Sequence, residues 1–231
     1  MSDIKFGTDG WRAVIAEDFT FDNVRAVAQA TAEWLKREKQ ADRGVVVGYD
    51  TRFLSGSFAS AVAEVMAANH IKVALTSTFV PTPALSWAVR DRKAGGGVMI
   101  TASHNPARWN GFKVKPDYGG SAPEAVTSAI ENAVPGIIAG NKVLTMPLGE
   151  AETQGLVERI DVRAQYLRAL AGFVDLDAIR AANFNVLIDP MFGSAQGWLP
   201  RLLEGGATTV RELHGERNPS FPNLRAPEPI A

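Results

Sequence analysis

Apolar residues recur along the chain in two patterns, one with helical spacing and one in short unbroken runs. Between residues 18 and 39, the side chains Val24, Val27, Thr31 and Leu35 fall three or four positions apart, which predicts an amphipathic helix with Thr20 as its N-cap. The run "VVV" at 45–47 is β-branched and bounded by glycines, so it predicts a buried strand.

The same alternation continues to about residue 140. A helix is predicted over 121–134, where Ser121 and Glu124 stand in capping-box spacing. Strands that alternate with helices are typical of a three-layer α/β/α fold with a mixed, mainly parallel sheet. The remaining predicted elements of this part are helices over 55–70 and 81–90 and strands over 71–75, 96–101 and 111–115.

The last third of the chain repeats the pattern in a shorter form, with a first helix capped by Asp161. We divide the chain into a first domain at 1–145, a Gly/Pro-containing linker at 146–160 and a partial second α/β domain of the same type at 161–231. Two strands rarely form a stable sheet alone. We therefore expect an N-terminal portion of a longer protein, whose open sheet edge favours a homo-oligomer.

Composition excludes several classes of function. The formal net charge of −1 provides no long-range attraction to nucleic acid or to a membrane surface. The absence of cysteine excludes thiolate catalysis and cysteine-rich zinc sites, and the three histidines are far apart in sequence. The chain has neither an N-terminal secretory signal nor an apolar run of about 20 residues, so a cytoplasmic location is expected.

The stretch "ITASHNPARWNGFKVK" at 100–115 concentrates the candidate chemistry. A serine after a buried strand suggests a hydrolase, but the expected Gly-x-Ser-x-Gly is absent, and the adjacent side chains of Ser103 and His104 tend to point apart. Serine, asparagine and proline are also common in plain polar turns, which is the alternative interpretation.

Charge favours another role for this stretch. No acidic residue lies between Asp91 and Asp117. Cations and turn amides without carboxylates are typical of an anion site. A phosphate on Ser103 would carry about −1.5 to −2 charges, so we interpret this serine as a phosphoryl carrier. The basic side chains of the interval are Arg92, Lys93, His104, Arg108, Lys113 and Lys115.

Two further stretches bear on this interpretation. "KFGTDGWR" at 5–12 contains Asp9 and Arg12, with a loop before the first helix as the alternative interpretation. "VGYDTRFLSG" at 47–56 puts Asp50 and Arg52 at the carboxyl end of a strand, where ligands bind in open α/β sheets. The alternative there is a local Asp50–Arg52 pair.

Taken together, these stretches resemble the α-D-phosphohexomutase superfamily of phosphoglucomutases and phosphomannomutases. "TASHNP" resembles its phosphoserine loop, "FGTDGWR" its N-terminal motif and "GYDTRFLSG" its Asp-x-Arg motif, while "VLIDPMFGSAQG" and "NPSFPNLRAPEP" are similar to segments of its second domain. Trp11 and Ala13 depart from the commonest pattern, and the sugar preference stays open.

The resemblance implies an isomerase that moves a phosphoryl group between O1 and O6 of a hexose phosphate, glucose above all, through a bisphosphate intermediate. Ser103 would be the carrier, His104 and Lys113 would act as general acid or base, and Arg12 would lie beside the phosphoserine. Alternatives are that Lys113 only binds phosphate and that His104 is a turn histidine. The residues implied in substrate or phosphate binding are Arg52, Asn105, Asn110 and Thr101.

The resemblance also implies Mg²⁺, held by the Ser103 phosphate and by aspartates from a loop that this sequence does not contain. The nearest candidate, Asp175 to Asp177, is interpreted as the start of a short helix. We therefore expect the isolated chain to be inactive as an enzyme. The alternatives are a non-catalytic α/β domain that binds phosphate or self-associates, preference for mannose or glucosamine phosphate, and a nucleic-acid binder, which the net charge disfavours.

Overall fold

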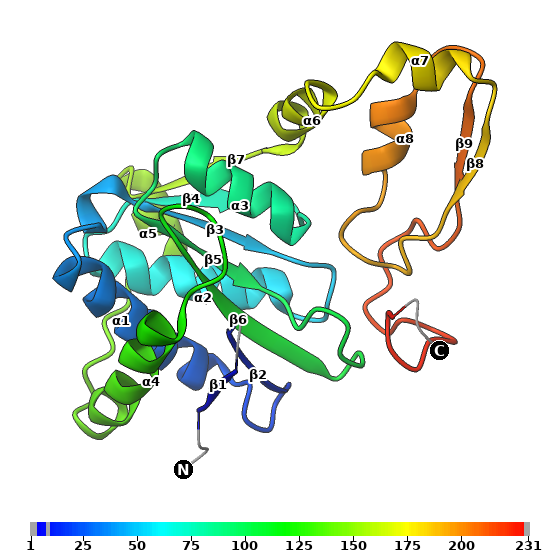
Figure 1. Ribbon diagram of the computed structural model, residues 1–231. Coiled ribbons are helices and arrows are strands. Elements are labelled where there is room, and N and C mark those ends of the chain that lie inside the picture. The colour runs from blue at the N-terminus through cyan, green and yellow to red at the C-terminus, as the bar shows by residue number, and fades with distance from the viewer. Residues whose placement is uncertain (1–3, 8–9, 229–231) are drawn as a thin grey trace.

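A seven-stranded mixed sheet forms the centre of the larger part of the molecule (Figure 1). The computed structural model describes residues 4–7 and 10–228. Strands β3, β4, β5 and β7 pair in parallel, whereas β6 is antiparallel to both β5 and β2. Among the described strands of this sheet, β1 and β6 therefore run antiparallel to the others, and the predicted mixed, mainly parallel sheet is confirmed. In sheet order the strands are β1 (Phe6–Gly7), β2 (Gly10–Val14), β6 (Trp109–Pro116), β5 (Gly96–Ile100), β3 (Val45–Tyr49), β4 (Val73–Thr76) and β7 (Val157–Ile160).

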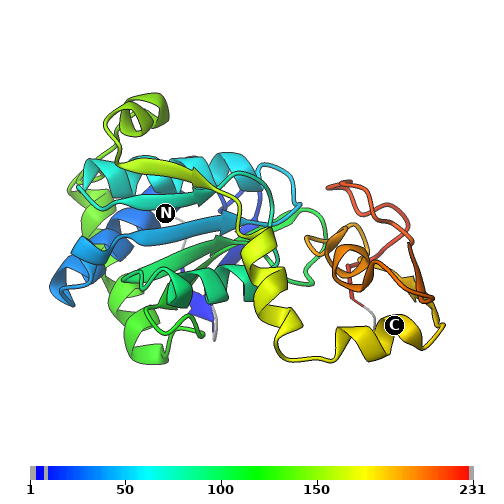
Figure 2. The ribbon, with the colours of Figure 1, turned by 90° about the horizontal axis from the view of Figure 1, so that it is seen from above.

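Helices cover both faces of this sheet, which completes the predicted α/β/α layers (Figure 2). Alternate strand residues point to opposite faces. Val45 and Val47 accordingly pack with α1, α2 and α4, whereas Val46 packs with α3. The helices of this part are α1 (Phe21–Arg37), the single-turn η1 (Ala41–Arg43), α2 (Ser55–Ala68), α3 (Thr82–Asp91), α4 (Glu124–Ala139) and α5 (Leu148–Thr153).

Helix starts were predicted with mixed success. Thr20 caps α1 and accepts a hydrogen bond from the Asn23 N–H at 3.3 Å, as predicted. The capping box of Ser121 and Glu124 is wrong, because α4 begins after Pro123 without a side-chain cap. Asp161 accepts from the Arg163 N–H at 2.9 Å and so satisfies the start of α6, although Val162 is the cap residue.

Residues 146–160, predicted as a linker, contain α5 and the edge strand β7. The structure corrects this prediction, because β7 pairs in parallel with β4, from Val73 opposite Val157 to Thr76 opposite Ile160. Ala151 and Val157 are also buried in the main core. The segment thus extends the first sheet.

The N-terminal segment, for which a loop was the alternative interpretation, forms β1 and β2. Trp11 is 2% exposed and stacks on Phe19 with ring centroids 4.7 Å apart. β2 pairs with β6, which places Arg12 opposite Gly111. Asp9, also singled out in the sequence, lies outside the described residues.

The C-terminal part is a smaller unit at the right of Figure 1, joined to the first through α6. Two parallel strands form its sheet, and several large apolar side chains beside them are exposed, among them Phe184 and Leu187. No helix among the described residues is long and apolar enough to cross a membrane. The elements of this unit are α6 (Arg163–Ala171), α7 (Leu176–Ala181), β8 (Asn185–Ile188), α8 (Trp198–Leu203) and β9 (Thr209–Glu212).

Candidate active site

The loop that carries Ser103 leaves the carboxyl end of β5 and returns as β6. Ser103 has φ +56°, a left-handed conformation that is uncommon for a residue with a Cβ. Its N–H donates to Thr101 Oγ1 at 3.1 Å, and the Asn105 N–H donates to the Ala102 carbonyl at 3.1 Å. Such a conformation persists only where the surroundings hold it, so the loop needs a strong external support.

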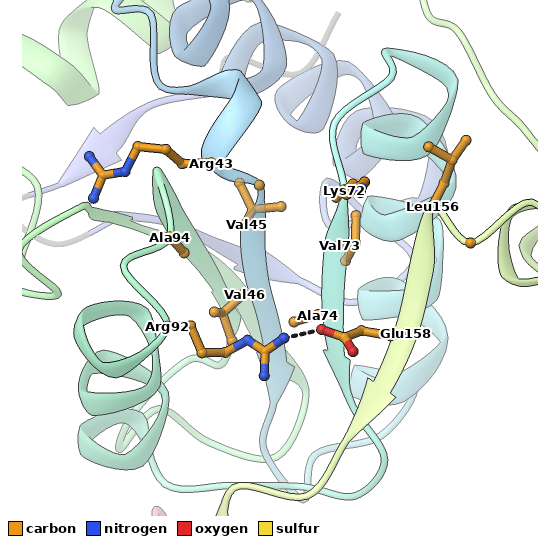
Figure 3. A pocket seen from close by; sticks show the side chains of 12 residues that line it. Arg43, Val45, Val46, Lys72, Val73, Ala74, Arg92, Ala94, Leu156 and Glu158 are labelled. Carbon is orange, nitrogen blue, oxygen red and sulfur yellow. Dashed lines mark hydrogen bonds and ion pairs between the residues drawn. The ribbon is translucent and has the colours of Figure 1, made fainter.

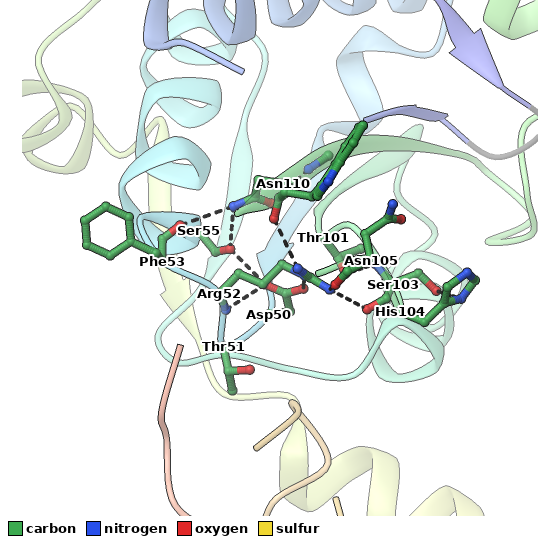
Figure 4. Close-up of polar contacts among 12 residues, drawn as sticks. Asp50, Thr51, Arg52, Phe53, Ser55, Thr101, Ser103, His104, Asn105 and Asn110 are labelled. Carbon is green, nitrogen blue, oxygen red and sulfur yellow. Dashed lines mark hydrogen bonds and ion pairs between the residues drawn. The ribbon is translucent and has the colours of Figure 1, made fainter. Parts of the chain in front are cut away.

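Arg52 provides that support from the end of β3 (Figure 4). Its Nη1 donates to the carbonyls of Pro106 (2.9 Å) and Trp109 (3.1 Å), and its Nη2 donates to those of Ser103 and Asn105, both at 2.7 Å. Arg52 is 1% exposed. Its four Nη–H groups are thus all committed to loop carbonyls, which leaves none of them for a phosphate.

Asp50 compensates the buried charge of Arg52. Asp50 Oδ2 lies 3.2 Å from Arg52 Nε, an ion-pair contact whose N–H is not aligned as a hydrogen bond. Asp50 Oδ1 accepts from the Arg52 N–H and from Ser55 Oγ. Burial lowers the pKa of Arg52, and the Asp50 carboxylate opposes that shift by favouring the charged guanidinium.

Asn110 lies behind the loop and is fully buried. It donates to Ser55 Oγ at 2.9 Å and to the Phe53 carbonyl at 3.3 Å, and it accepts from the Gly111 N–H at 2.9 Å. These contacts link the start of β6 to the start of α2. Asn110 therefore holds the two ends of the loop support together.

Arg12 reaches the loop from β2. Its Nη1 donates to Asn105 Oδ1 at 2.9 Å, a contact between residues 93 positions apart. The antiparallel pairing of β2 with β6 brings Arg12 there, opposite Gly111. The structure thus places Arg12 and Asn105 side by side at the loop.

His104 is 59% exposed and meets two polar groups through one ring nitrogen. Its Nδ1 lies 3.4 Å from Ser103 Oγ and 3.4 Å from Glu228 Oε2. The expectation that Ser103 and His104 point apart is therefore wrong, because the left-handed turn at Ser103 brings the two side chains to the outer limit of hydrogen-bond distance.

Lys113 lies further along β6, with its Cα opposite Met99. Its side chain is 6% exposed and does not line the cavity at Ser103. Gly10 passes close to it, since a Cβ there would lie 3.1 Å from Lys113 Cγ. The structure therefore buries Lys113 beside β2.

A cavity of about 360 Å³ opens in front of Ser103 between the two units. Thr82, the first residue of α3, lines it, so that the positive end of that helix faces the cavity. Two contacts fasten the units together here: Thr51 Oγ1 donates to the Phe192 carbonyl at 2.8 Å, and the Phe221 ring lies 5.2 Å from the Arg52 guanidinium carbon. The lining residues are Asp50, Thr51, Arg52, Thr82, Thr101, Ser103, His104, Pro190, Met191, Gly193, Ser194, Phe221, Pro227 and Glu228.

Phe221 and Glu228 were not predicted as site residues. The only signal was their place in "NPSFPNLRAPEP", and no local pattern indicates that this segment reaches a loop more than 100 residues away. Glu228 also brings a carboxylate to a loop that has none of its own.

The basic residues grouped by sequence separate in space. Ser103 follows β5, whereas Arg92 and Lys93 precede it, at the other end of the strand. The hypothesis that all these cations form one anion site is corrected, because an extended strand separates them.

Residues 4–7 and 10–228 contain no group of three histidine or acidic side chains that could hold a metal ion. Asp175 caps α7 by accepting from the Ala178 N–H at 2.9 Å, in line with its interpretation as a helix start. Near Ser103, Asp50 is bound to Arg52 and Ser55, and Glu228, whose Oε2 lies 3.4 Å from His104 Nδ1, is the other carboxylate of the cavity lining. The described residues therefore do not fit a magnesium site by themselves.

Comparison with known proteins gives consistent matches along the chain. Residues 3–139 match the family "Phosphoglucomutase/phosphomannomutase, alpha/beta/alpha domain I", and residues 164–231 match its domain II. A phosphoglucomutase from Komagataeibacter xylinus is 29% identical over 94% of this chain and 41% of its own length. A phosphoglucosamine mutase from Natranaerobius thermophilus is 30% identical over 91% of this chain and 45% of its own.

Comparison with solved structures gives a match of the same kind. The crystal structure of a putative phosphomannomutase from Thermus thermophilus superposes with a TM-score of 0.86 and 39% identity, over 99% of this chain and 49% of that one. The chain thus spans less than half the length of these relatives.

Proposed function

This chain belongs to the phosphoglucomutase/phosphomannomutase family, and from that premise we propose that Ser103 carries the phosphoryl group in the interconversion of hexose 1-phosphates and hexose 6-phosphates. One observation carries the proposal. Arg52 holds the backbone of Ser103 and of the loop that follows it through four carbonyls, and the serine lies in a left-handed turn at the mouth of a cavity.

The proposed chemistry is two reciprocal transfers. A sugar hydroxyl oxygen attacks the phosphorus of phosphoserine, the bond between phosphorus and Ser103 Oγ breaks, and the proton that the sugar hydroxyl loses is made up on Oγ. The resulting bisphosphate reorients in the cavity. Oγ then attacks the phosphorus of its other phosphate, the bond from that phosphorus to the sugar oxygen breaks, and the sugar oxygen gains the proton that Oγ loses. His104 Nδ1, 3.4 Å from Oγ, is the side-chain group that we propose exchanges that proton.

Phosphoryl transfer is catalysed mainly by positioning and charge neutralisation. Arg12 at Asn105 and the N-terminus of α3 at Thr82 support a dianion at this place. Arg52, Asn105 and Asn110 hold the loop in our proposal, and Thr101 binds the Ser103 N–H. Buried Lys113 is proposed to act from β6 as acid, base or phosphate ligand.

No step is assigned to Mg²⁺, because the described residues do not fit the ion. Glucose is the proposed sugar, supported by the relatives named phosphoglucomutase, although others are named for phosphoglucosamine or phosphomannose. We also propose that the 231-residue chain alone is inactive as an enzyme and that the protein is located in the cytoplasm.

The test starts with the carrier. Incubation of the proposed full-length protein with glucose 1,6-bisphosphate should add one phosphate, seen as intact mass and localised by peptide fragmentation to Ser103. Ser103→Ala should abolish the addition, whereas Ser60→Ala, within α2, should not, since the Ser60 hydroxyl donates to the Gly56 carbonyl of its own helix. Phosphate on another residue, or none at all, would overturn the proposal.

Turnover is tested separately. A coupled assay of the chain with the 1-phosphates of glucose, mannose and glucosamine should give no product above the Ser103→Ala background. Product from one sugar would refute inactivity and at the same time identify the substrate.

A further inference from the structure

A second cavity, of about 500 Å³, lies at the ends of the strands that are opposite to the end at which Ser103 lies (Figure 3). We call it the amino-edge cavity, because the amino-terminal ends of β3 and β4 line it. β5 spans five residues between Arg92 and the Ser103 loop, and a strand rises about 3.3 Å per residue, so the two cavities lie roughly 15 Å or more apart. The proposed phosphoryl transfer does not use this site.

Basic side chains dominate the lining of the amino-edge cavity. Arg43, Lys72 and Arg92 line it, and Glu158 is the one acidic residue of the lining. Figure 3 shows the Arg92 guanidinium reaching across the strands to pair with Glu158. Within residues 4–7 and 10–228, Lys72 has no ion pair. Arg43 pairs with Asp117, which lies outside the lining, at 3.0 Å, so the positive charge of the lining that no carboxylate offsets among the described residues is that of Lys72.

Backbone contacts hold these cations in place. The Val45 N–H donates to the Lys72 carbonyl at 2.8 Å, and a Cβ on Gly44 would lie only 2.7 Å from that oxygen. Arg43 Nε donates to the Lys93 carbonyl at 2.9 Å, and the Gly95 N–H donates to the Gly44 carbonyl at 2.8 Å. Three separate loops are thus fastened together, which fixes the points at which these basic side chains leave the backbone.

The floor between the cations is apolar. Val46 of β3 and Ala74 of β4 face the side of the sheet that α3 covers and are 0% and 7% exposed, whereas the half-buried Leu156, which also lines the cavity, packs against the core on the opposite side. Aliphatic surface beneath a rim of guanidinium and ammonium groups suits a ligand with one anionic end and one carbon-rich end. Arginine and lysine are the usual partners of phosphate groups.

From this combination we propose that the amino-edge cavity binds a small phosphate monoester, with the phosphate between Lys72 and Arg92 and the organic group beside Ala74 and the partly exposed Leu156. Glu158 is the internal competitor of the ligand, because it occupies Arg92 in the free protein. Removal of that carboxylate should therefore strengthen binding, a result that a merely structural ion pair would not produce.

The experiment titrates the ¹⁵N-labelled 231-residue chain with phenyl phosphate and, separately, with inorganic phosphate, and follows the backbone amides. Amides of Gly44, Ala94 and Gly155, all in the lining, should shift together, and phenyl phosphate should bind more tightly. Amides at Thr101 and Ser103 report the other cavity independently.

Variants identify the ligand groups. Lys72→Ala and Arg92→Ala should each weaken binding roughly fivefold, as expected for one partly exposed charge contact, and Glu158→Gln should tighten it by a similar factor. Lys142→Ala, an exposed lysine outside the lining, is the matched control and should leave binding unchanged. Shifts confined to the Ser103 loop, or equal affinity in Lys72→Ala, Arg92→Ala and the control, would overturn the proposal.

Discussion

Replacement of Arg52 by lysine tests whether the fork of the guanidinium, and not merely its charge, holds the Ser103 loop. Arg52→Lys keeps one positive charge beside Asp50 but has three donors on a single nitrogen, in place of four Nη–H groups that point at four different carbonyls. One ammonium cannot reach both Pro106 and Ser103 and also remain at Asp50.

The expected cost follows from the bonds that are lost. If the ammonium retains two of the four carbonyls, two hydrogen bonds from a charged donor disappear, and each contributes about 1.5 kcal/mol or more in a buried site. We therefore expect Arg52→Lys to lower the free energy of unfolding by about 3 kcal/mol. That is a large fraction of the roughly 5–15 kcal/mol typical of a domain.

Urea unfolding followed by tryptophan fluorescence measures this change, since Trp11 and Trp34 are buried in the first unit. Arg159→Lys is the matched control, because Arg159 is an exposed arginine with a single bond, to Glu152. It should change stability by less than about 0.5 kcal/mol. Equal stability of the two variants, at unchanged slope with urea, would refute the reasoning.

Three further predictions concern packing and charge. Gly111→Ala should destabilise the chain by about 2 kcal/mol or more, because the new Cβ would lie 2.5 Å from the Thr101 carbonyl oxygen. Gly136→Ala, at an open position of α4, should instead stabilise the chain by roughly 0.5–1 kcal/mol, and urea unfolding compares the two variants. Phe221→Leu should cost about 1 kcal/mol by removing the ring over the Arg52 guanidinium, and a double-mutant cycle with Arg52→Lys should show that the two changes are not additive. Burial raises the pKa of Asp189, but hydrogen bonds from a backbone N–H and an imidazole outweigh burial and lower that pKa below its ordinary value. The ionised Asp189 carboxylate therefore stabilises the folded chain above about pH 4, and this stabilisation is lost as the pH falls through the folded-state pKa. Thermal unfolding of Asp189→Asn should accordingly differ from the parent at about pH 6 and converge with it toward about pH 2.

The long amphipathic helices and buried strands were predictable because their patterns are strong and local. α1 carries its apolar stripe and its Thr20 cap within one stretch, and β3 begins with three consecutive valines. β7 has the sequence "VERI", with only Val157 fully buried, so its two outward charged residues hid a strand whose identity depends on pairing with β4. β2 was missed for a similar reason, because its partner β6 lies almost 100 residues away.

The candidate site shows the same division. The Ser103 turn and the participation of Arg52 in the site were indicated by motifs, but the direction of the Arg52 donors toward carbonyls depends on three-dimensional placement. Proximity in sequence misled in one case, since Arg92 is only eleven positions before Ser103 but lies beyond the opposite end of β5. Glu228 and Phe221 reach the loop through tertiary contacts that no periodicity encodes.

Arg52 recognises the Ser103 loop through main-chain oxygens alone, and this has a consequence for how the loop can evolve. Every residue type has a carbonyl, so side chains between 103 and 109 other than Asn105, which binds Arg12, can be exchanged without loss of the Arg52 bonds, provided that the left-handed turn is tolerated. The shape of the turn and the identity of the nucleophile can in this sense change independently of each other. A single scaffold can therefore present serine, or a different reactive side chain, at one fixed point in space.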